Sequence, residues 1–105
     1  MIFSLIIETA EDRAKQAIAA LQTQISAAID AQVETQAQAL GYNSAAACVG
    51  YIGSSVSSWA EEAQAFIVWR DAVWTAAYRL LEKHRAEKSV PSVADALAAL
   101  PVWGK

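Results

Sequence analysis

The chain has 105 residues, of which 55% are hydrophobic and 18% are charged, and its formal net charge is −3. This length allows one domain at most, and no uncharged apolar run approaches the roughly 20 residues of a membrane span. The acidic balance argues against a nucleic-acid-binding surface. Because globular chains are usually about 25% charged, the low charged fraction indicates that part of the surface contacts another protein.

The first residues and the cysteine content of the chain indicate in which compartment the protein is expected. The opening MIFSLII is apolar, but it lacks a basic region and runs directly into Glu8, so we do not expect a secretory signal peptide. Cys48 is the only cysteine, which prevents an internal disulfide and fits a reducing compartment.

A long helix is predicted from about Thr9 to Leu40, because this stretch contains no glycine or proline and is rich in Ala, Gln, Glu, Ile and Leu. Unbroken, it would be about 45 Å long. At about 100° per residue, its apolar residues fall on one narrow stripe. The stripe comprises Ile7, Ala14, Ile18, Leu21, Ile25, Ile29, Val33 and Leu40.

A stripe this narrow is typical of a coiled-coil-like seam, in which intruding glutamines would set register and partner number. We therefore predict that residues 1–40 form an association helix and that residues 41–105 form a compact helical head. The alternative is a peripheral helix packed on its own domain. The residues predicted to associate with a partner or with a second copy are Ile18, Leu21, Ile25, Ile29, Val33, Gln36 and Leu40.

Short elements are predicted on both sides of a second long helix. Gly41 is placed to end the first helix in a left-handed conformation. Asn43 or Ser44 can cap a short segment, Ala45 to Ile52, and residues 54–58 form a loop.

The second long helix is predicted to run to about Ala86. Ser58-Trp59-Ala60-Glu61 has the spacing of a capping box at its start, and basic residues follow in its last turns. Ser92 can cap a final short helix that Pro101 stops. The predicted fold is all-α, with a long N-terminal helix, a central Trp-rich helix and two short helices.

The Trp-rich stretch, residues 57–88, contains three of the four tryptophans and presents a wide apolar arc. Large aromatic rings each bury roughly 150–250 Å², so they should dominate so small a core. The residues predicted to lie in this core or at an interface are Trp59, Phe66, Trp69, Arg70, Trp74 and Tyr78.

Arg70 lies near the centre of that apolar arc and needs a partner, because an unpaired buried guanidinium costs several kcal/mol. One option is stacking over Trp74, with the charged head reaching water. The other is a carboxylate from another helix or another chain, with Asp30 and Glu34 as candidates. Asp71 points about 100° away and is expected to be a poor partner.

The sequence contains no constellation typical of an enzyme or a metal site. His84 has no second His or Cys at ligand spacing, and Cys48 has no base that the sequence places near it. Residues 50–53, GYIG, lack the lysine and the glycine pattern of a phosphate loop. We therefore expect no catalytic residue, no metal site and no cofactor.

From Gly41 onward the chain resembles a family of small phage tail-region proteins. The most distinctive segment is residues 69–74, WRDAVW. Further matching pieces are Gly41-Tyr42-Asn43-Ser44, Tyr51 with Ser54-Ser55, Glu62 before Ala65-Phe66, Tyr78, and Leu97 to Pro101. XkdW-like prophage proteins are a candidate distant branch of the same group. Residues 1–40 match only as a generic Ala- and Gln-rich helix.

The resemblance implies a non-enzymatic protein that binds a tail fibre or spike, as an assembly chaperone or a retained accessory subunit. The alternative is a self-assembling structural component of the virion tail. Either role implies a homo-oligomer or a complex with another tail protein, without nucleic acid or membrane. The implied locations are the host cytoplasm during assembly and the virion tail.

Overall fold

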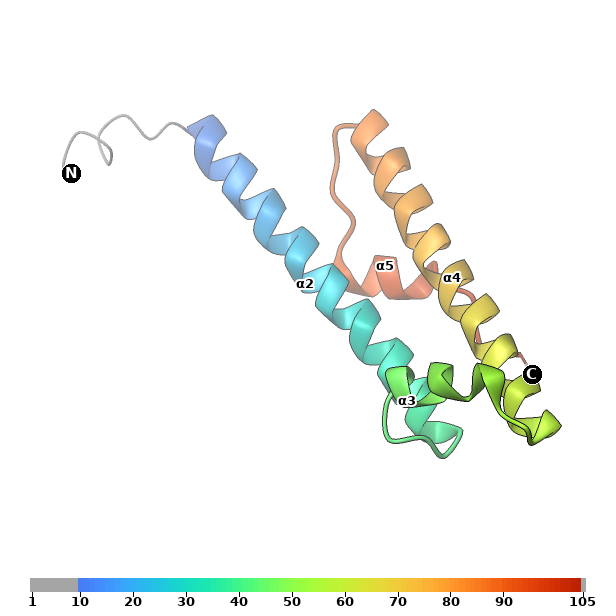
Figure 1. Ribbon diagram of the computed structural model, residues 1–105. Coiled ribbons are helices and arrows are strands. Elements are labelled where there is room, and N and C mark those ends of the chain that lie inside the picture. Colours follow the sequence, from blue (N-terminus) through green and yellow to red (C-terminus); the bar gives the residue numbers. More distant parts are fainter. Residues whose placement is uncertain (1–9, 105) are drawn as a thin grey trace.

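The computed structural model describes residues 10–104, and every regular element in that range is a helix (Figure 1). The first nine residues, with the apolar opening and Ile7 of the predicted stripe, lie outside the described residues, as does Lys105. The helices in chain order are α2 (Ala10–Ala39), α3 (Ala45–Val49), the 3₁₀ helix η1 (Gly50–Gly53), α4 (Ser57–Ala86) and α5 (Val93–Ala98). The predicted all-α fold, with a long N-terminal helix, a central Trp-rich helix and short helices, is confirmed. The short segment predicted from Ala45 to Ile52 is divided into α3 and η1, so three short helices form where two were predicted.

The turn after α2 forms as predicted. Gly41 has a φ of +102°, a left-handed conformation that glycine adopts without steric cost. The amide of Gly41 donates to the carbonyl of Gln38 at 3.0 Å, and that of Tyr42 donates to Ala37 at 3.1 Å. These two bonds satisfy the carbonyls of Gln38 and Ala37, near the end of α2, in a Schellman arrangement.

The caps of the two short helices also follow the prediction. The Ser44 hydroxyl accepts from the Ala47 amide at 3.0 Å, and Ser92 accepts from the Asp95 amide at 3.0 Å. Glu34, which was considered as a partner for Arg70, instead accepts from the Ala45 amide at 3.0 Å. Its carboxylate therefore ties α2 to the first turn of α3.

The capping box predicted at Ser58 is wrong. Helix α4 begins at Ser57, and its N-cap is Val56 in an extended conformation with no side-chain cap. The amides of Trp59 and Ala60 both donate to the Val56 carbonyl at 3.1 Å, so the first turn closes before Ser58 could act as a cap.

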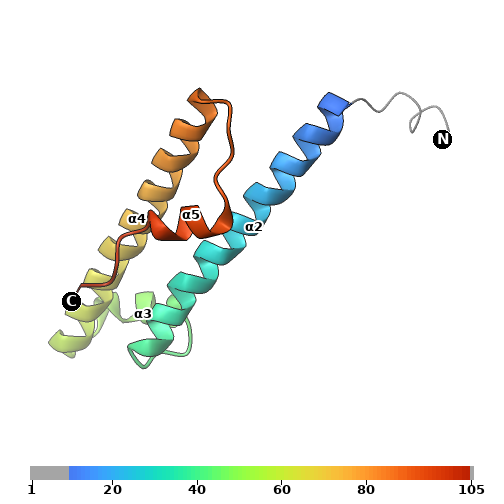
Figure 2. The same ribbon diagram turned by 180° about the vertical axis from the view of Figure 1, so that it is seen from behind.

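The two long helices run antiparallel and diverge toward the N-terminal end of α2, and α5 crosses between them (Figures 1 and 2). Helices α3 and η1 connect them at the other end. The dimensions are 62 × 31 × 19 Å, with a radius of gyration of 18.4 Å. A compact chain of this length would have a radius of about 13 Å, so the molecule is elongated.

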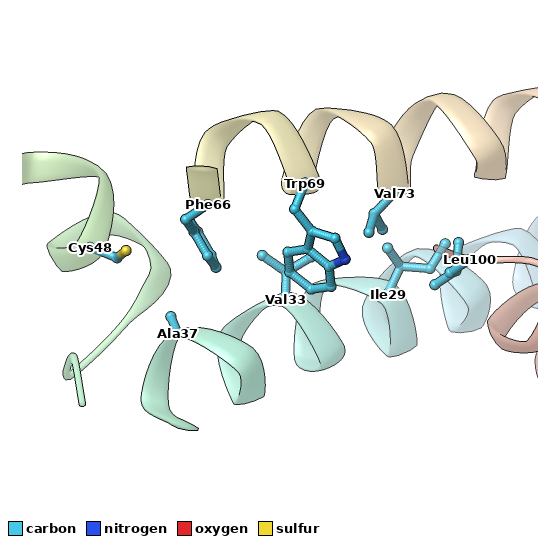
Figure 3. Close-up of a cluster of buried hydrophobic side chains, with 8 residues drawn as sticks. All are labelled: Ile29, Val33, Ala37, Cys48, Phe66, Trp69, Val73 and Leu100. Atoms are coloured by element: carbon cyan, nitrogen blue, oxygen red, sulfur yellow. The ribbon is translucent and has the colours of Figure 1, made fainter. Parts of the chain in front are cut away.

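The core fills only the half of the molecule where α2 ends and α4 begins. Figure 3 shows the core side chains of α4 pointing toward α2, with Cys48 and Leu100 at the two sides of the cluster. Its members are Ile29, Val33, Ala37, Cys48, Phe66, Trp69, Val73 and Leu100. The core thus draws on both sides of residue 41, and the division into a 1–40 association helix and a 41–105 head stays a prediction.

Candidate interaction surface

The structure divides the predicted association stripe of α2 into two parts. Ile29 and Val33 are buried in the core of the same chain, at 1% and 5% exposure. Leu21, Ile25, Gln36 and Leu40 are half-buried, and Ile18 is 40% exposed. The spacing of these residues identified one helix face correctly, but it could not show that the chain's own α4 covers part of that face. Association through this stripe stays a prediction.

An apolar groove lies between α2 and α4, next to the point where α5 crosses. Ile25 of α2 faces Trp74, Tyr78 and Leu81 of α4 across a cavity of about 80 Å³. The groove continues to a wider mouth of about 280 Å³, which shares Gln22 and Leu81 with the first cavity. The mouth is also lined by Ile18, Arg85, Lys88, Ser89 and Val90.

The N-terminal part of α2 extends away from the rest of the fold and is exposed to solvent. Every residue from Ala10 to Ala20 is exposed. An isolated helix of this length is marginal in water, and proteins normally stabilise such helices by packing their apolar face. This arm therefore exposes Ala14 and much of Ile18, which also lines the mouth of the groove.

The aromatic residues predicted for a core or an interface fall into both classes. Phe66 is fully buried, and Trp69 is 9% exposed. The Trp69 indole donates from Nε1 to the Pro101 carbonyl at 3.0 Å, and its ring packs edge-to-face on Trp103 at 5.8 Å. This contact attaches the C-terminal segment to α4, a pairing that the sequence did not indicate.

Trp59, Trp74 and Tyr78 lie outside the buried cluster. Trp74 is half-buried against the core, whereas Tyr78 is 64% exposed and Trp59 is 49% exposed. The rings of Trp74 and Tyr78 lie 6.3 Å apart along the groove. Trp59 and Tyr78 thus expose aromatic surface to solvent.

The expectation that Asp71 is a poor partner for Arg70 is wrong. The Arg70 guanidinium donates from Nε and Nη2 to Asp71 Oδ1 at 3.2 and 3.0 Å. The flexible stem carries the charge out of the apolar arc, and the Arg70 side chain is 35% exposed. Since both charges remain hydrated, Arg70 needs neither Asp30 nor Glu34.

A second pocket adjoins the Gly41 turn. The Tyr42 hydroxyl donates to Glu62 Oε1 at 2.7 Å, and this hydrogen bond to a carboxylate raises the pKa of Tyr42 to about 12. Leu40, Gly41, Tyr51 and Trp59 form the rest of its wall. The sequence did not predict this grouping, although Tyr42, Tyr51 and Glu62 all belong to the segments that carry the family resemblance.

His84 and Cys48, the residues considered for metal binding and catalysis, have the following surroundings in the fold. Nδ1 of His84 lies 2.8 Å from the Ser89 hydroxyl, just beyond the end of α4. Cys48 is buried, and burial raises the pKa of its thiol, which disfavours the nucleophilic thiolate. Within residues 10–104, no three His, Cys, Asp or Glu side chains are grouped so that they could hold a metal ion.

None of the helices described for residues 10–104 is both long and apolar enough to cross a membrane. No protein family model, curated protein or solved structure matches this chain.

Proposed function

We propose that this protein is a non-enzymatic binding protein that holds a helical segment of another protein in the groove between α2 and α4. One observation carries the proposal. The two long helices diverge above α5 and leave apolar side chains of both helices, among them Ile18, Ile25, Tyr78 and Leu81, lining an open groove. An amphipathic helix that lays its apolar face into such a groove buries surface on both sides.

The mouth of the groove favours an acidic segment. Arg85 and Lys88 both line it. Arg85 also forms an ion pair with Glu82, with Nη1 and Oε1 3.0 Å apart. Carboxylates on the polar side of the bound helix would meet these cations, while its apolar side chains would contact Ile18 and Leu81. The rim charges would mainly affect the association rate and its dependence on salt.

The partner class comes from the family resemblance of residues 41–105. It is a tail fibre, a spike or another phage tail protein, and this protein acts as its assembly chaperone or as a retained accessory subunit. The proposed location is the host cytoplasm during assembly, with the virion tail as the second location when the subunit is retained.

Co-expression with the tail-fibre gene of the same phage genome tests the proposal. We expect the two proteins to co-purify and the yield of soluble fibre to rise. Leu81→Glu places a charge in the groove and should abolish co-purification. Val68→Glu is the matched control, because Val68 is 60% exposed and does not line the groove. No co-purification of the unmodified pair would refute the proposal.

The exposed arm of α2 favours a second candidate, a structural tail component that assembles with itself. Pairing of two copies through Ala14, Ile18, Leu21 and Ile25 would cover the same stripe without another protein. Sedimentation of the purified chain should then show a dimer or larger oligomer that Ile18→Glu dissociates. Mass spectrometry of virions should also find the protein in stoichiometric amount, whereas a transient chaperone would be absent.

A further inference from the structure

A pocket with three aromatic rings and one carboxylate lies where the end of α2, η1 and the start of α4 come together, and Leu40 and Gly41 complete its lining. Figure 1 shows these elements at the end of the molecule opposite the one toward which α2 and α4 diverge. The ring centroids of Tyr42 and Tyr51 are 5.5 Å apart. Those of Tyr51 and Trp59 are 5.7 Å apart, with the ring planes at 86°. Glu62 follows Trp59 by three residues on α4, which places both on one helix face. The Tyr42 hydroxyl donates to Glu62 Oε1, which connects Glu62 to the first ring of the pocket.

The groups of this pocket are open to a ligand. Tyr51 is 41% exposed and Trp59 is 49% exposed, whereas Phe66 and Trp69 are buried in the core. The Tyr42 hydroxyl occupies only Oε1 of the Glu62 carboxylate and leaves Oε2 for another donor. No ion pair of the described residues 10–104 involves Glu62. The pocket therefore combines exposed aromatic surface with a negative charge that no ion pair of the described residues neutralises.

This combination suits a cation with a flat, weakly hydrated surface. Aromatic rings attract cations through their electron-rich faces, and a carboxylate adds a charged hydrogen-bond acceptor. The cavity measures about 250 Å³, below the roughly 300–1,000 Å³ of pockets for drug-sized ligands. It therefore suits one side chain better than a cofactor.

We propose that this pocket binds the guanidinium group of an arginine side chain supplied by a partner protein. The planar guanidinium can stack on an aromatic ring while it donates to Oε2 of Glu62, which the compact ammonium of lysine cannot do equally well. The site is separate from the α2–α4 groove, so this inference does not depend on which segment that groove binds.

Titration with N-acetyl-arginine amide tests the proposal on the intact chain. The reporter is the NMR signal of the Trp59 indole N–H, identified by its absence in Trp59→Phe. The matched neutral probe is N-acetyl-citrulline amide, which has nearly the same shape without the charge. N-acetyl-lysine amide compares the ammonium group. We expect the arginine probe to shift the Trp59 signal saturably and to bind at least about threefold more tightly than the citrulline probe, the ratio for a cation–π contact at an exposed site.

Three variants complete the experiment. Glu62→Gln removes the charge but keeps an oxygen that can accept from Tyr42, and Tyr51→Leu removes one ring. Each should weaken arginine binding by at least about threefold while circular dichroism shows an unchanged helical fold. Tyr78→Leu is the control, because it removes a tyrosine ring that is even more exposed than Tyr51 but does not belong to the pocket, and it should leave binding unchanged.

Each remaining outcome overturns the proposal in a distinct way. Equal binding of the arginine and citrulline probes would show that charge is not recognised. Lysine binding as tight as arginine binding would exclude a guanidinium-selective site. Equal shifts of the indole signals of all four tryptophans would show non-specific association.

Discussion

The contact between Trp69 and the C-terminal segment gives a sharp test of how this small core is stabilised. Trp69 is 9% exposed, and its indole donates to the Pro101 carbonyl at 3.0 Å. Trp69→Phe keeps an aromatic ring at the position but removes the donor and the larger ring. We expect a clear loss of stability with no change of fold.

The magnitude follows from two contributions. A typical intramolecular hydrogen bond contributes about 0.5–1.5 kcal/mol, and Pro101 is only half-buried, so water can solvate its freed carbonyl. The smaller ring also leaves a gap in the core, which costs roughly 1–2 kcal/mol at about 0.8 kcal/mol per buried methylene-sized group. Together we expect Trp69→Phe to lower the free energy of unfolding by about 1.5–3.5 kcal/mol.

Urea unfolding followed by far-ultraviolet circular dichroism measures this loss without depending on tryptophan fluorescence. With a slope of about 1–3 kcal/mol per molar, the midpoint should fall by about 0.5 M or more. Trp59→Phe is the matched control, because Trp59 is 49% exposed, and it should cost under about 1 kcal/mol. Equal effects of the two substitutions would refute the proposed role of the Trp69–Pro101 contact.

A double-mutant cycle separates the attachment of the C-terminal segment from the loss of core volume. Trp103 packs edge-to-face on Trp69 at 5.8 Å. If Trp69 stabilises the fold partly by holding this segment, Trp69→Phe and Trp103→Leu should not be additive. We expect a coupling of at least about 0.5 kcal/mol. Full additivity would mean that the two residues act independently.

Three further predictions concern the α2 stripe, the tyrosine–carboxylate pair and the free thiol. Ile29→Ala should cost about 2–5 kcal/mol in urea unfolding because Ile29 is buried, whereas Ile18→Ala should cost under about 1 kcal/mol because Ile18 is 40% exposed; equal costs would contradict the division of the stripe. The pKa of Tyr42 is raised to about 12 from 10.0. The folded state therefore holds this proton more tightly, and the associated stabilisation is complete below pH 10 and is lost as the pH rises from 10 toward 12. A spectroscopic titration should show the pKa falling toward its usual value in Glu62→Ala, and an unchanged value would exclude the carboxylate as the cause. Cys48 is buried and burial raises its pKa, so a thiol reagent should react with it only when urea unfolds the chain; rapid reaction without urea would contradict this burial.

The sequence by itself determined the helices and most of their ends. The run without glycine or proline before Gly41 predicted the helix α2. Gly41 marked its end, because the turn that follows the helix needs a residue in a left-handed conformation. Ser44 and Ser92 also act as the predicted caps. These features depend on contacts between residues close together in the chain, which is why a sequence can reveal them.

The start of α4 and the pairing of Arg70 show where such local reasoning fails. Val56 ends the preceding loop in an extended conformation, so α4 begins before the serine that resembles a cap. A long flexible side chain can reach Asp71 although the two Cβ atoms point in different directions. The sequence pattern favoured Ser58 as the cap of α4 and disfavoured Asp71 as the partner of Arg70. The backbone conformation at Val56 and the side-chain conformation of Arg70 reversed both preferences.

Only the tertiary structure decided which apolar faces are covered. The stripe of α2 and the arc of α4 are properties of single helices, but their burial depends on the angle at which α2 and α4 diverge and on α5 crossing between them. The aromatic pocket likewise joins Tyr42, Tyr51 and Glu62 from three separate segments. A helical pattern shows that a face is apolar, and packing between distant segments determines whether that face belongs to the core or remains for a partner.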